Sequence, residues 1–159
     1  MEQNVSMKIN ELPSPTWNWL KVNETPIKWS NKIEPCEIAA EGDAVSTETE
    51  QLSDIETGAG READAIFATE NTAKYQILAD NAGQDKTVRL HISGKKDAHT
   101  AGCVEIVAKE NSTLTVVMDS RVAPDATKEE DSTAEASLAV RVKMKVESGA
   151  SVRLVQVQM

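Results

Sequence analysis

The stretch that decides the fold is LAVRVKMKV, residues 138–146. Apolar residues occupy every second position, and three of the four positions between them carry a positive charge. A period of two places these sets on opposite faces of a β-strand, one toward a core and one toward water. The short turn 148–150 separates this half-buried strand from another strand expected over 151–159. Because a sheet open at its last strand leaves backbone groups unpaired, we expect the chain to be the front portion of a larger protein.

Short alternating segments also fill the rest of the sequence after Tyr75. They predict strands at 75–78, 88–92, 104–108 and 114–118, ahead of the strands at 137–147 and 151–159. The turns between them are short and polar, and no helical pattern interrupts them. The sequence therefore predicts an all-β body over 76–159, with a charged and mobile loop over 119–135.

Residues 1–75 differ from this body. The first 35 residues contain four prolines and all three tryptophans, Trp17, Trp19 and Trp29, which predicts an extended arm pinned by its indole rings. Residues 37–53 are acidic and rich in Ser and Thr, which predicts a loop. Apolar spacings of three and four predict a helix within 54–71, most securely over 60–70. We therefore divide the chain into an N-terminal arm and helical region, 1–75, and a β domain, 76–159.

An internal sequence repeat, here called the internal echo, bears on the type of β fold. Residues 107–117 can be aligned with residues 145–155 with a one-residue gap, and in this alignment Leu114 matches Val152, 38 residues later. Such a repeat favours a solenoid whose successive coils stack their apolar faces. The alternative is an antiparallel β-sandwich, because hairpins can imitate two copies of a repeat.

Composition excludes several partners. Seventeen Lys and Arg against 26 Asp and Glu give a formal charge of −9, which disfavours nucleic acid and anionic membranes. The first residues do not resemble a secretory signal, and no stretch has the roughly 18 apolar residues of a membrane span. We expect a cytoplasmic protein. Because Cys36 and Cys103 form no C-x-x-C pair, the sequence does not predict a disulfide framework.

The sequence offers three candidate ligand sites, and for each an ordinary structural role explains the residues better than ligand binding does. Iron or zinc would need His91, His99 and Cys103 to converge with a fourth ligand, whereas alternation points His91 outward and puts His99 in the 94–102 loop. Residues 58–63, GAGREA, fit a dinucleotide fingerprint but follow no apolar strand. The acidic run 125–131 lacks the ligand order of a calcium loop. We therefore assign no catalytic, metal or cofactor residues, and no hydrolase constellation is present.

Several segments carry a resemblance to a known family. Residues 12–24, LPSPTWNWLKVNE, resemble the opening of SufD-type proteins. Residues 56–64, 108–112 and 152–158 are similar to later parts of the same proteins, so the resemblance spans nearly the whole chain. The family is the SufB/SufD scaffold group of the SUF iron-sulfur cluster assembly system.

This resemblance implies a right-handed parallel β-helix preceded by a short N-terminal region with one helix. It also implies a non-enzymatic role beside a SufB-like scaffold and the SufC ATPase. Full members are longer, and their cluster-binding residues and ATPase-docking helices lie beyond the part matched here. No functional residue is therefore carried over, and an iron-sulfur cluster is expected only in the full assembly.

Two functions of different classes follow. The first is a SufD-like scaffold portion whose open coil pairs with a partner coil and buries Val155 and Val157, so that the isolated chain forms a homodimer or larger assembly. The alternative is a stand-alone β-sandwich that binds a carbohydrate or small ligand. The alternative is weaker because the strands after Tyr75 contain no aromatic residue to line a binding face.

Overall fold

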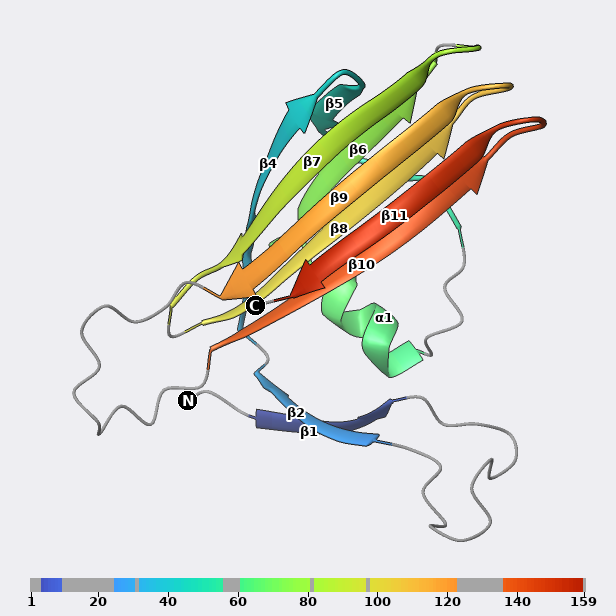
Figure 1. Ribbon diagram of the computed structural model, residues 1–159. Coiled ribbons are helices and arrows are strands. Elements are labelled where there is room, and N and C mark those ends of the chain that lie inside the picture. Colours follow the sequence, from blue (N-terminus) through green and yellow to red (C-terminus); the bar gives the residue numbers. More distant parts are fainter. Residues whose placement is uncertain are drawn as a thin grey trace, which may run out of the picture.

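The computed structural model describes residues 4–9, 25–30, 32–55, 61–80, 82–96, 98–122 and 136–158. These residues form a mainly β structure with one short helix, α1 (Arg61–Phe67) (Figure 1). The strands of the N-terminal half are β1 (Asn4–Ile9), β2 (Thr25–Ser30), β3 (Ile33–Pro35), β4 (Glu37–Gly42) and β5 (Val45–Glu48). The remaining strands are β6 (Ala73–Ala79), β7 (Asp85–Gly94), β8 (His99–Ala108), β9 (Thr113–Val122), β10 (Ser137–Val146) and β11 (Ser151–Gln158).

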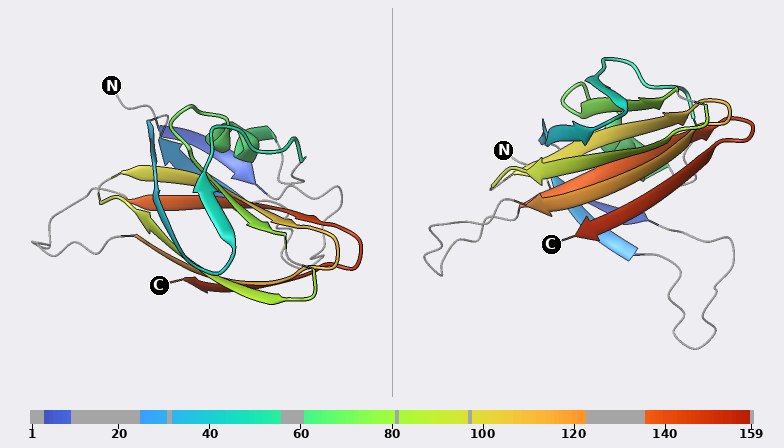
Figure 2. Two further views of the ribbon diagram at one scale, coloured as in Figure 1. Left: turned by 90° about the horizontal axis from the view of Figure 1, so that it is seen from above. Right: turned by 45° about the horizontal axis from the view of Figure 1, so that its top comes forward.

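Two mixed, mostly parallel sheets make up the body. The first has the order β10-β8-β6-β5, with β3 also on β8, and the second has the order β11-β9-β7-β4. Figure 2 shows them as two facing layers. A separate antiparallel pair joins β1 to β2. All six strands predicted after Tyr75 are therefore confirmed, and most extend beyond the predicted bounds.

Consecutive strands after β6 lie in alternate sheets. The chain runs along β6 in the first sheet, turns into β7 in the second, and repeats this with β8 and β9 and then with β10 and β11. We call these two-strand units the first, second and third rungs. Within each sheet the strands of neighbouring rungs are parallel. The antiparallel β-sandwich is therefore not the arrangement of these strands.

The internal echo corresponds to the pairing register between the second and third rungs. Val152 pairs with Leu114, and Ser137 pairs with His99, both at a separation of 38 residues. The echo needs no gap, because Val146 pairs with Ala108 at that same separation. The one-residue gap in the sequence comparison was therefore wrong. The pairing instead shows one constant shift through both strands and the turn between them.

The core fills the space between the two sheets. Tyr75, Ile77, Val104 and Ile106 come from the first sheet, and Val88, Leu90, Leu114, Val116 and Met118 come from the second. Each alternates with an outward-facing neighbour, as the period of two requires. Removing a side chain of this size from water stabilises the fold by about 1.5–3 kcal/mol. The core is therefore the common product of the alternating pattern in all three rungs.

The N-terminal half departs from expectation in two places. Residues 37–53 were predicted as a loop, but they contain β4, antiparallel to β7, and β5, antiparallel to β6. Backbone pairing at a sheet edge is open to any residue type, so the acidic composition did not reveal these strands. The predicted helix is confirmed only over 61–67, because residues 54 and 55 have no regular secondary structure and 68–71 form turns and a bend, while 56–60 lie outside the described residues. The segments containing Trp17, Trp19, Gly58, Gly60 and most of the 119–135 loop lie outside the described residues.

Candidate protein interaction surface

The third rung has a free edge in both sheets. β10 pairs with β8 and β11 pairs with β9, and no described strand pairs with the opposite side of either. Figure 1 shows the two strands together at one border of both layers. The outer backbone donors and acceptors of this border are therefore available to another strand. We call this border the free edge.

Exposed hydrophobic side chains gather on the same two strands. Met144 and Val146 on β10 are 42% and 48% exposed, and Val155 and Val157 on β11 are 37% and 40% exposed. Among the described residues, these are the large hydrophobic side chains with the greatest exposure. Apolar side chains beside unpaired backbone are typical of a surface that binds a further strand.

The core also remains partly open at the third rung. Leu138, Val140 and Leu154 pack against the core but are only half-buried, whereas Leu114 and Val116 in the second rung are fully buried. A cavity of about 270 Å³ lies here. Its lining comprises Met118, Ser120, Arg121, Val122, Leu138, Val140, Gln156 and Gln158. A strand added at the free edge would therefore complete the burial that the third rung begins.

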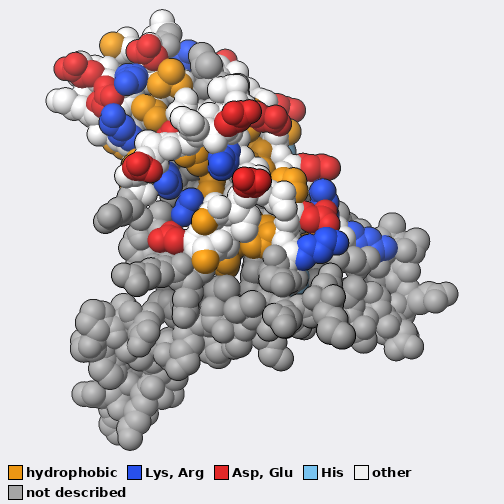
Figure 3. Space-filling view, turned by 180° about the vertical axis from the view of Figure 1, so that it is seen from behind, with side chains coloured by type: hydrophobic (Ala, Val, Ile, Leu, Met, Phe, Trp, Pro, Cys, Tyr) orange, Lys and Arg blue, Asp and Glu red, His pale blue; other side chains and the backbone are white. Residues whose placement is uncertain are grey.

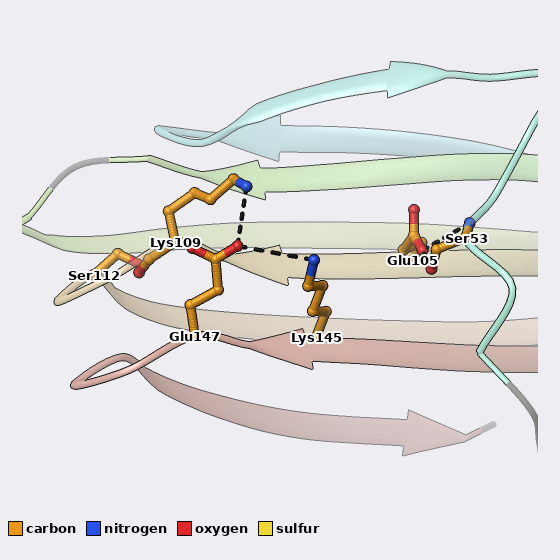
Figure 4. A network of polar contacts seen from close by, with 6 residues as sticks. All are labelled: Ser53, Glu105, Lys109, Ser112, Lys145 and Glu147. Atoms are coloured by element: carbon orange, nitrogen blue, oxygen red, sulfur yellow. Dashed lines mark hydrogen bonds and ion pairs between the residues drawn. The ribbon is translucent and has the colours of Figure 1, made fainter.

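An ion-pair network holds the third rung on the second (Figure 4). Lys109 Nζ lies 3.0 Å from Glu147 Oε1, and Lys145 Nζ lies 3.9 Å from the same oxygen. The hydrogen bond and charge of Lys109, with a smaller contribution from Lys145, hold the pKa of Glu147 below its usual value. Ser112 donates a 2.6 Å hydrogen bond to the carbonyl of Lys109 and fixes that turn. The turn of the third rung is thus anchored before any partner binds.

Glu105 is a buried carboxylate on the outer face of β8. Its carboxylate accepts hydrogen bonds from the backbone and hydroxyl of Ser53 and a 2.7 Å bond from Gln76 Nε2. Burial acts to raise the pKa of Glu105, but these hydrogen bonds and the charge of Lys143 outweigh it, so the pKa is lowered. Lys143 Nζ also donates to the Ser53 carbonyl at 2.8 Å. Lys74 Nζ on β6 donates to the Glu50 carbonyl at 3.0 Å, so residues 50–53 are tied to strands of all three rungs.

The helix covers the same outer face. Arg141 on β10 forms a 3.0 Å ion pair with Asp64 on α1 and lies 4.8 Å above the centre of the Phe67 ring. Ile66 packs with Ile33 and Ala101 in a second apolar cluster. The side of the molecule opposite to Figure 1 shows basic, acidic and hydrophobic side chains interspersed (Figure 3). Alternation over 104–108 assigns Glu105 to the outer face of its strand but does not predict its burial, because the covering segments are distant in the chain.

The candidate metal ligands His91, His99 and Cys103 do not form a metal-binding cluster in the described part of the chain. His91 lies on the outer face of β7, 3.6 Å from Asp119 Oδ2. The prediction that His99 lies in a loop is wrong. His99 is the first residue of β8, and its Nδ1 lies 2.6 Å from Ser137 Oγ. Among the described residues, no group of three or more His, Cys, Asp or Glu side chains is placed to hold a metal ion. The 125–131 run and the glycines of 58–63 lie outside those residues.

Both cysteines are free and buried. Burial raises the pKa of the Cys36 thiol to about 11. Cys103 is 1% exposed on β8, as is typical of a free cysteine that packs as a small apolar side chain. In the part of the chain that the structure describes, no helix is long and apolar enough to cross a membrane.

Comparison of the chain with models of known protein families, with curated proteins and with solved structures found no match. The class of the protein is defined by its structure alone. It is a mainly β protein with two mixed, mostly parallel sheets and a free edge at which a further strand could pair.

Proposed function

We propose that this chain is a SufD-like, non-enzymatic scaffold component of iron-sulfur cluster assembly. It acts through protein contacts with a SufB-like scaffold and a SufC-like ATPase in the cytoplasm. The chain itself binds no cofactor, and the cluster belongs to the full assembly. The free edge is the surface through which it meets a partner coil.

The observation that carries this proposal is the parallel pairing of all three successive rungs, which between the second and third rungs keeps one shift of 38 residues through both strands. Strands that alternate between two sheets and pair in parallel with the next rung are what a flattened right-handed parallel β-helix requires. The rungs and the one short helix before them also agree with the order of elements expected from the SufB/SufD resemblance. We therefore propose the SufBD-like solenoid as the finer description of the fold.

The rigidity of the rungs suits a scaffold. The second rung is buried on both faces of β8, and ion pairs and backbone hydrogen bonds continue through the turns. A partner strand would therefore meet a preformed edge, which reduces the conformational entropy lost on binding. Backbone hydrogen bonds supply register, and Val155 and Val157 supply apolar area.

Co-purification tests the proposed partners. The 159-residue chain is mixed with a SufB-like protein, with and without SufC-like ATPase, and complexes are measured by size-exclusion chromatography with light scattering. We expect a defined complex with the SufB-like protein. Val155→Lys should weaken it at least tenfold, because a lysine at an edge position opposes strand addition.

The matched control is Thr115→Lys. Thr115 lies on the same outer face, but on β9, which has a neighbour on each side. This variant should bind as the unmodified chain does. A failure of the unmodified chain to bind the SufB-like protein, with SufC-like ATPase present, would contradict the proposed partnership.

A further inference from the structure

We infer that the free edge also accepts the opposite border of a second copy of this chain, so that copies associate head to tail. The opposite border is residues 37–50, which contain β4 and β5, and we call it the acidic border. The inference rests on the proposed function in one respect, because it names a partner for the same free edge.

The acidic border carries only negative charge. It contains five carboxylates and neither Lys nor Arg, and the carboxylates are Glu37, Glu41, Asp43, Glu48 and Glu50. All five residues are exposed. β4 and β5 each pair with only one described strand, so this border also has unpaired backbone groups.

The free edge carries the opposite charge. Residues 137–158 contain four cationic side chains, Arg141, Lys143, Lys145 and Arg153, against the single carboxylate of Glu147. Lys145 is 58% exposed along its side chain, and Arg153 is also exposed. An edge that is basic and apolar therefore lies at one end of the stack of rungs, and an acidic edge lies at the other (Figure 1).

The two borders terminate the same two sheets. The first sheet ends in β10 on one side and β5 on the other, and the second ends in β11 and β4. A second copy stacked on the free edge would set its β4 beside β11 and its β5 beside β10. β4 runs antiparallel to β7, so it would also run antiparallel to β11, which is parallel to β7 through β9.

A contact of the same kind already exists within the chain. Glu41 on β4 pairs in register with Arg89 on β7. Through β9, Arg89 is aligned with Val155 of β11, and Thr87 is aligned with Arg153. A second copy stacked in this register would set Val155 beside Glu41, and Arg153 beside Asp43, whose amide donates to the Thr87 carbonyl within the chain. Opposite charges facing across neighbouring strands contribute about 0.2–1 kcal/mol per pair.

Charge disfavours the symmetric alternative. Pairing β11 with β11 of a second copy, and β10 with β10, brings together two edges that carry the same excess of positive charge. Like charges placed together at an interface are destabilising. Head-to-tail contacts are heterologous, so they produce rings or open filaments rather than a closed dimer.

Charge-reversed variants and their mixture test the inference. One variant is Glu37→Lys/Glu41→Lys and the other is Lys145→Glu/Arg153→Glu, and association is measured by light scattering and sedimentation velocity. Each alone should raise the dissociation constant of self-association at least tenfold, and mixing the two should restore it. Raising salt from about 0.05 M to about 0.5 M should weaken association of the unmodified chain, because exposed charges are then screened.

Two controls keep the test interpretable. Glu70→Lys/Glu110→Lys makes the same change in net charge at two exposed residues outside both borders, and it should associate as the unmodified chain does. Circular dichroism checks the fold of every variant. If a reversal unfolds the chain, the neutral variant Glu37→Gln/Glu41→Gln replaces it, with weakened association still expected.

Each outcome decides a different point. Undiminished association of the acidic-border variant would overturn the head-to-tail inference in favour of symmetric pairing at the free edge. A monomeric unmodified chain that still binds the SufB-like protein would also overturn it, while leaving the proposed function standing. A chain that neither self-associates nor binds that protein would contradict both proposals.

Discussion

Asn111 and Gly149 occupy the same position in consecutive turns, and both have a positive φ, 59° and 68°. Gly83 lies in the preceding turn with a φ of 79°. The Gly83 amide donates to the Asn111 carbonyl at 3.2 Å, and the Asn111 amide donates to the Ser148 carbonyl at 3.0 Å. The turns therefore stack in the same left-handed conformation that glycine and asparagine tolerate best.

Gly149→Ala should destabilise the chain by about 1–3 kcal/mol. The new methyl group would meet Asn111 Oδ1 in addition to adopting a positive φ. Gly83→Ala is the matched control, because its methyl group would meet nothing within 4 Å and reports the cost of φ alone. Denaturant unfolding measures both. Equal losses in the two variants would contradict the steric contribution from Asn111.

Glu105→Gln should lower the free energy of unfolding by about 1–3 kcal/mol. The change replaces a buried acceptor of three hydrogen bonds by an amide that also presents donors to Ser53 and Gln76. Glu110→Gln, at an exposed turn residue, should change the free energy by less than about 0.5 kcal/mol. Similar values for the two variants would show that the Ser53 contacts are not stabilising.

Glu105 should also make stability depend on pH. Its pKa is lower in the folded state than its ordinary value of 4.5, so near that value the unfolded chain binds more protons. The contribution is therefore fully present above the ordinary pKa and is lost as pH falls through the folded pKa. Unfolding free energies of the unmodified chain should fall more steeply below about pH 4.5 than those of Glu105→Gln. Parallel curves would contradict this assignment.

Gly102→Ala should be strongly destabilising, by about 2 kcal/mol or more. The added methyl group would overlap Cys36 Sγ in a tightly packed part of the core. Cys36→Ala removes that sulfur, so the double variant should be more stable than the sum of the two single changes predicts. A double-mutant cycle in denaturant measures the coupling. Additive changes would mean that the two residues do not share this contact.

The strands and their shift were predictable because they depend on local pattern. The alternation over 138–146 identifies β10, and the echo of Leu114 in Val152 gives the pairing register of two rungs. The period of two also placed His91 correctly on an outer face. These features require only the side-chain pattern of each strand and the comparison of one turn with the next.

Features made by distant segments were not predictable. β4 and β5 are held by backbone pairing, and their few core contacts, from Ile38 and Ala40, stand among acidic residues that obscure the pattern of a strand. Glu105 occupies an outward position of β8 and becomes buried only because segment 49–55 passes over it. The two strands of the free edge, β10 and β11, were predicted from alternation, whereas the acidic border lies in a segment that composition marked as a loop.

The unequal shift between rungs has a practical meaning for engineering. Asp85 pairs with Thr113, 28 residues later, whereas Thr113 pairs with Ser151 after 38, yet β7, β9 and β11 remain aligned. The additional length falls between Val122 and Ser137, on the side away from the stacked glycine and asparagine turns. Foreign epitopes or reporter peptides can therefore be grafted into that connection without disturbing strand alignment, while the glycine-bearing rim should tolerate no such insertion.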